Sequence, residues 1–120
     1  MGRGSSKAEQ KRAQENRFKK ANELKRAVTR TKSNYTRKRN DYLKAAGAVT
    51  MMDWGGQPAG KSNPRYADYQ KRVKARNKAY RELMKATRER DRAQSRLNAF
   101  ARANERRYKK MYGEDANAPF

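Results

Sequence analysis

Two long segments of this chain carry apolar residues about every 3.5 positions. In the first segment eight of the twelve residues in this row are apolar, and the row is Gln14, Arg17, Ala21, Leu24, Val28, Thr31, Tyr35, Lys38, Tyr42, Ala45, Val49 and Met52. In the second, eight of thirteen are apolar: Tyr69, Val73, Arg76, Tyr80, Leu83, Thr87, Arg90, Gln94, Leu97, Ala101, Asn104, Tyr108 and Met111. Such a narrow row, called the seam below, is typical of coiled-coil helices.

The residues between the two segments predict a reversal of the chain. They include Gly55, Gly56, Pro58, Gly60 and Pro64, which favour turns over helix. The predicted fold class is therefore all-α, with two long helices forming an antiparallel, coiled-coil-like helical hairpin. This hairpin either stands alone, oligomerises or is ordered by its partner.

Residues that favour helix ends divide the chain further. Ser6 with Glu9 fits a capping box, Asn63 before Pro64 fits a helix start, and Gly113 fits a helix end. Gly47 permits an earlier end of the first helix, but the seam continues to Met52 and favours the later one. The expected parts are a flexible N-terminus (1–5), a basic helix (6–52), a hinge (53–63), a second basic helix (64–112) and an acidic, polar tail (113–120).

Folding the chain at the hinge pairs residues whose numbers add up to about 118. Ala21 then faces Leu97, and Tyr35 faces Leu83. In this register Lys38 lies over the ring of Tyr80, and Arg76 lies over that of Tyr42. Arg90 falls opposite Val28 and has no aromatic partner.

The composition leaves little to bury and excludes many chemistries. Leu, Val and Phe together number ten in 120 residues, and the net charge is +21. We therefore expect marginal stability without a partner. The chain has no Cys and no His, so zinc sites, haem ligation, disulfides and His-based catalysis cannot be built. We expect no enzymatic activity, no cofactor and no metal.

Two short strings match known motifs by letter. Residues 55–62, GGQPAGKS, fit the phosphate-binding P-loop pattern. The flanks are helical and lack the preceding strand that a P-loop needs, so we interpret the string as a turn. Residues 1–6, MGRGSS, fit the N-myristoylation pattern, which is short enough to arise by chance.

The positive charge divides almost equally between the arms, with +11 over residues 1–46 and +12 over 64–112. Eighteen of the 33 cations are Arg, which suits forked contacts with phosphate. The predicted nucleic-acid-binding residues are Lys11, Arg12, Lys19, Lys20, Lys25, Arg26, Arg37, Arg39, Lys71, Arg72, Arg88, Arg92, Arg102, Arg106, Arg107, Lys109 and Lys110.

These features predict a non-catalytic protein that binds DNA or RNA through phosphates, with little sequence dependence, and neutralises, packages or buttresses it. A genome-condensing, virion-internal or ribonucleoprotein component would fit. The alternative is a structural or assembly protein that docks on an acidic protein surface or oligomerises. Trp54 and Phe120 are weaker candidates for protein docking.

The expected location is inside a cell or a virion. No apolar run approaches the ~18 residues of a membrane span, and the N-terminus lacks the apolar core of a signal peptide. We do not expect a membrane surface to be the partner.

Overall fold

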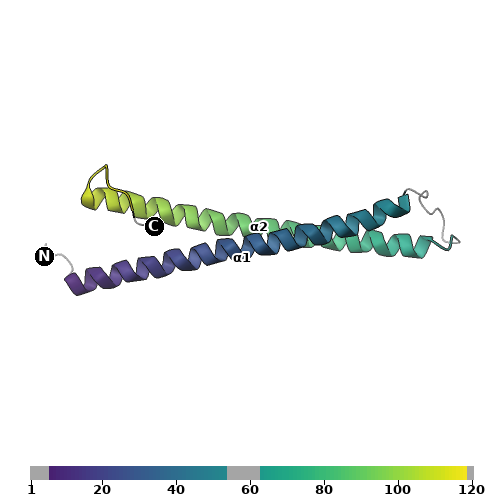
Figure 1. Ribbon diagram of the computed structural model, residues 1–120, viewed down its shortest axis with the longest axis horizontal. Helices are drawn as coiled ribbons and strands as arrows, with labels where there is room; N and C mark the ends of the chain where they lie inside the picture. The colour runs from purple at the N-terminus through teal and green to yellow at the C-terminus, as the bar shows by residue number, and fades with distance from the viewer. Residues whose placement is uncertain (1–5, 54–62, 119–120) are drawn as a thin grey trace. The chain divides into compact units, whose positions relative to one another are not determined.

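The computed structural model describes residues 6–53 and 63–118, and in these residues the only regular elements are two helices. Helix α1 spans Lys7–Asp53 and helix α2 spans Tyr66–Tyr112 (Figure 1). The two helices pack against each other as a hairpin. The predicted all-α fold class is confirmed.

Both helices contribute to each of two compact units. Unit 1 comprises residues 1–30 and 91–120, and unit 2 comprises residues 31–90. Contacts within unit 2 establish the helix directions, because the residue number falls on α2 as it rises on α1. The contacting pairs are Lys38 with Glu82, Tyr42 with Tyr80, Ala48 with Arg72, and Met52 with Arg65. The helices of this unit are antiparallel.

Side chains cap the N-terminal ends of both helices. The Ser6 hydroxyl accepts a hydrogen bond from the Glu9 N–H at 3.1 Å. The Asn63 Oδ1 accepts one from the Arg65 N–H at 2.8 Å. Each cap satisfies a donor that has no partner within the helix. Regular α2 begins at Tyr66 and not at residue 64, because Pro64 and Arg65 form a turn in which the Tyr66 N–H reaches the Asn63 carbonyl at 3.0 Å.

Two glycines have opposite effects on the helices. Gly47 lies inside α1, which continues to Asp53 as the seam predicts. Gly113 ends α2 with a φ of 104°, and its N–H donates to the Lys109 carbonyl at 2.8 Å. A positive φ strains residues that carry a Cβ, so the helix stops where glycine permits the bend.

Few residues in the described part of the chain are buried, and most of them are small. They are Ala21, Val28, Val49 and Met52 on α1, and Leu83, Ala86, Ala93 and Asn104 on α2. All twelve predicted seam residues of α1 are buried or half-buried. The α1 seam is thus confirmed, and it packs mainly through alanine and valine.

On α2 the packing face lies partly beside the predicted seam. Ala86 and Ala93 are buried, whereas their predicted neighbours Thr87 and Gln94 are half-buried. Thr87 donates its hydroxyl hydrogen bond to the Leu83 carbonyl of its own helix at 2.8 Å. Burial of alanine avoids the desolvation of polar groups, which explains why the face is rotated toward the alanines. Two predicted seam residues are exposed, namely Tyr80 and Met111.

The predicted aromatic partners of Lys38 and Arg76 were wrong. Lys38 forms an ion pair with Glu82 in place of a contact with the Tyr80 ring. Arg76 lies beside Asn77, with Nη2 3.4 Å from Oδ1, and not over Tyr42. The Tyr42 ring packs against the Tyr80 ring at 5.7 Å between centroids, with the planes tilted by 57°.

Arg90, expected to lack an aromatic partner, lies over the Tyr35 ring. In the contacts between the helices of unit 2, the sum of the residue numbers differs from the predicted 118 by one to seven. That register pairs apolar residues, and it does not account for the ion pair of Lys38 with Glu82 or the packing of the Tyr42 ring on the Tyr80 ring.

Candidate nucleic-acid interface

Most of the predicted contact residues are exposed. Fifteen of the seventeen have exposed side chains: Lys11, Arg12, Lys19, Lys20, Lys25, Arg26, Arg37, Arg39, Lys71, Arg88, Arg92, Arg102, Arg106, Arg107 and Lys110. Arg72 and Lys109 are half-buried. Five of the seventeen belong to unit 2, namely Arg37, Arg39, Lys71, Arg72 and Arg88, and the other twelve belong to unit 1. The predicted contact residues are therefore divided between the two units.

Arg72 and Lys109 pair with carboxylates one turn before them. The Arg72 Nη2 lies 3.2 Å from the Asp68 carboxylate, and the Lys109 Nζ lies 3.2 Å from that of Glu105. Arg72 also donates to the Ala48 carbonyl at 3.1 Å. Exposed pairs of this kind contribute only about 0.3–0.5 kcal/mol. Since these cations are already partnered, they are poorer candidates for phosphate contacts than their exposed neighbours.

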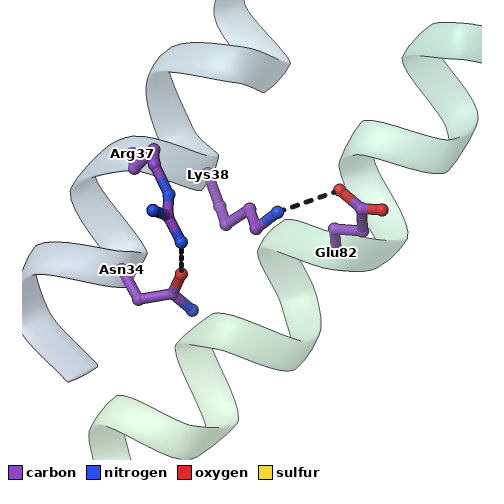
Figure 2. A network of polar contacts seen from close by, with 4 residues as sticks. All are labelled: Asn34, Arg37, Lys38 and Glu82. Carbon is purple, nitrogen blue, oxygen red and sulfur yellow. Dashed lines mark hydrogen bonds and ion pairs between the residues drawn. The ribbon is translucent and has the colours of Figure 1, made fainter. Parts of the chain in front are cut away.

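Several arginines are held by neutral oxygen atoms. The Arg17 Nη2 donates to the Gln14 Oε1 at 3.0 Å, and the Arg37 Nη2 donates to the Asn34 Oδ1 at 2.7 Å. Figure 2 shows the second contact, in which the amide oxygen of Asn34 faces the guanidinium. An amide orients the guanidinium without neutralising it, so Arg37 keeps its full charge for an external anion.

An ion pair between Lys38 and Glu82 joins the two helices in unit 2. The Lys38 Nζ lies 3.3 Å from the Glu82 carboxylate, across the interface between α1 and α2 (Figure 2). Both side chains are partly exposed, at 27% and 42%. Lys38 therefore links the two helices of unit 2, and it is not among the predicted contact residues.

A shallow groove of about 530 Å³ lies along one face of α1 in unit 1. Its lining residues are Asn22, Lys25, Arg26, Thr29 and Arg30. They recur at intervals of three and four, as residues on one helix face do. Three cations and two uncharged polar residues line the groove, and no carboxylate of the described residues does. Lys25 and Arg26 were predicted contact residues, but Arg30 was missed, although its position four residues after Arg26 could have indicated it.

Other candidates fall outside the described residues. These are Trp54, Phe120, the hinge residues 54–62 with the P-loop-like string, and residues 1–5 of the myristoylation-like string.

Among residues 6–53 and 63–118, no group of three or more acidic residues is placed to hold a metal ion. Neither α1 nor α2 is long and apolar enough to cross a membrane. The chain matches no protein-family model, and it has no significant similarity to a curated protein or to a solved structure.

Proposed function

We propose that this protein binds DNA or RNA through its phosphates without enzymatic activity, and that it neutralises, packages or buttresses the nucleic acid. One observation carries the proposal: exposed cations in both units far outnumber the carboxylates that could neutralise them. The net charge is +21, and both helices have an excess of basic residues.

The arrangement of the cations supports contacts with a backbone more than base reading. They lie all along α1 and α2, and arginine forks suit phosphate oxygens. Nucleic acid offers one charge per ~1.7 Å of duplex, and its condensed counterions are released when cations replace them. Since phosphates are the same in every sequence, we expect such a hairpin to bind different nucleic-acid sequences with similar affinity.

A titration with four polyanions tests the proposal. The probes are fluorescent single-stranded RNA, duplex DNA, vesicles with anionic lipids and poly-glutamate, each at ~150 mM salt. We expect binding of RNA, of DNA or of both, with at least tenfold lower affinity for vesicles and poly-glutamate. Absence of nucleic-acid binding at this salt concentration rules the function out, and preferred binding of poly-glutamate favours an acidic protein partner.

A second function, assembly with further copies of the chain, is favoured by one apolar surface. Leu43 and Met51 are 52% and 75% exposed, and residues 45–52 carry no charge. Gly47 lies between them on the same face of α1. Sedimentation equilibrium with and without RNA separates the two functions, because assembly predicts oligomers of the protein in the absence of nucleic acid.

A further inference from the structure

Unit 1 contains a small pocket between the two helices, with a volume of about 30 Å³. Gln14 and Arg17 of α1 line it, together with Asn104, Arg107, Tyr108 and Tyr112 of α2. The α2 residues recur at intervals of three and four, so one helix face supplies them all. Ala118 of the C-terminal tail also contributes to the lining.

The buried side chain of Asn104 lacks a partner for its donor. Asn104 is 8% exposed, and its Nδ2 has no hydrogen-bond partner among the described residues. Buried polar groups are nearly always paired, and an unpaired one lowers the stability of the fold. One residue that lines the pocket thus has a buried amide donor without an acceptor.

The two arginines that line the pocket are donors as well. Arg17 gives one N–H to the neutral Gln14 Oε1 and, within the described chain, none to a carboxylate. Arg107 is exposed at the pocket, and no acidic residue lines it. Two guanidinium groups and an amide donor together favour an oxyanion. The volume holds about two water-sized atoms, which matches the two non-bridging oxygens of one phosphate.

Two tyrosines add an aromatic surface next to these donors. The Tyr108 and Tyr112 rings are 4.5 Å apart between centroids and tilted by 44°. Tyr112 is 64% exposed, so one side of the pair is open. Exposed aromatic rings stack on bases of single strands, whose bases are not held inside a duplex.

We propose that this pocket binds one phosphate of a single nucleic-acid strand and that Tyr112 stacks on a neighbouring base. The contact with a nucleic-acid strand rests on the nucleic-acid binding proposed above, whereas the binding of a phosphate ion in the pocket does not. Because a duplex does not leave its bases open for stacking on Tyr112, we expect the protein to prefer single strands over duplexes.

NMR of the whole chain tests the pocket directly through the side-chain amide signals of Asn104. The probes are inorganic phosphate, a ten-nucleotide oligouridylate and a duplex of equal length. We expect the Asn104 signals to shift with phosphate, and with oligouridylate at concentrations at least tenfold lower. If neither probe moves them, the pocket proposal is wrong.

Arg107→Gln and Arg106→Gln form a matched pair, because the two changes remove equal charge from adjacent exposed positions and only Arg107 lines the pocket. We expect R107Q to weaken oligouridylate binding about tenfold and R106Q about twofold. Equal losses contradict the proposal. Asn104→Leu is the second variant: it removes the unpaired donor, so it should raise the Tm and still weaken oligouridylate binding. A rise in Tm with unchanged affinity would falsify a ligand role.

The results also separate this pocket from the general function. If all nucleic acids bind but the Asn104 signals stay still, the pocket proposal fails and the proposed function stands. If no nucleic acid binds while phosphate moves the Asn104 signals, the proposed function and the strand contact fail, and the phosphate pocket stands.

Discussion

The guanidinium carbon of Arg90 on α2 lies 4.1 Å from the centroid of the Tyr35 ring on α1. Both residues are half-buried, so the charge is partly shielded from water while it faces the ring. A cation over an aromatic face contributes about 0.5–2 kcal/mol, depending on its exposure. This contact connects the two helices of unit 2 at a position where the seam carries a charge.

Replacing either residue should therefore weaken the hairpin. We expect Tyr35→Leu and Arg90→Met to lower the free energy of unfolding, with a coupling energy between them of about 0.5–1 kcal/mol in a double-mutant cycle. Tyr35→Phe keeps a ring and serves as the control. Urea denaturation followed by circular dichroism measures these values, and additive effects of the two changes would show that the residues do not interact.

Gly47→Ala should stabilise the protein. Gly47 is helical, and an added Cβ meets nothing within 4 Å. Alanine is favoured over glycine inside a helix by about 1 kcal/mol, so the Tm should rise. Gly113→Ala should lower it, because the φ of 104° at this position is unfavourable for alanine. Thermal melts of both variants test the pair, and equal shifts would be incompatible with the helix ends described above.

Ala86→Gln should strongly destabilise unit 2. Ala86 is 2% exposed, so a longer polar side chain must displace the helices or lose its hydrogen bonds to water, at about 1–3 kcal/mol. Ala99→Gln is the matched control, since Ala99 is exposed on the same helix. Urea midpoints measure both. If the two variants are equally stable, Ala86 does not lie in the helix interface.

Asn63→Ala should cost about 1 kcal/mol of stability, because it removes the side-chain acceptor for the Arg65 N–H. Asn63→Asp keeps the acceptor and should retain most of the stability. The comparison of their Tm values checks the cap, and a stable N63A variant would mean that the start of α2 does not depend on it.

The sequence predicted the hairpin well because its main signals are local. Ser6, Asn63 and Gly113 mark helix ends by their own chemistry, and the α1 seam follows from the spacing of larger side chains. The α2 face was harder to place. Ala86 and Ala93 lie directly beside Thr87 and Gln94 in the chain, and alanine is too small and too common here to indicate which row is buried.

Contacts between the helices were predicted least well. Arg90 contacts Tyr35 and Lys38 contacts Glu82, and neither pair can be inferred from the spacing of apolar residues. Asn104 was placed in the α2 seam, but its role in a pocket depends on Arg17 from the other helix. A pocket formed by residues of two helices can be recognised only from the structure.

The salt dependence of nucleic-acid affinity is the most direct test of whether the protein binds nucleic acid through its phosphates. The association constant of a labelled RNA and of a duplex is measured between about 50 and 300 mM salt, each with two unrelated sequences. We expect a log–log slope of about −4 or steeper, from five or more phosphate contacts at about 0.7–0.9 each, and similar affinity for the two sequences. A slope near zero, or a tenfold preference for one sequence, would contradict this expectation.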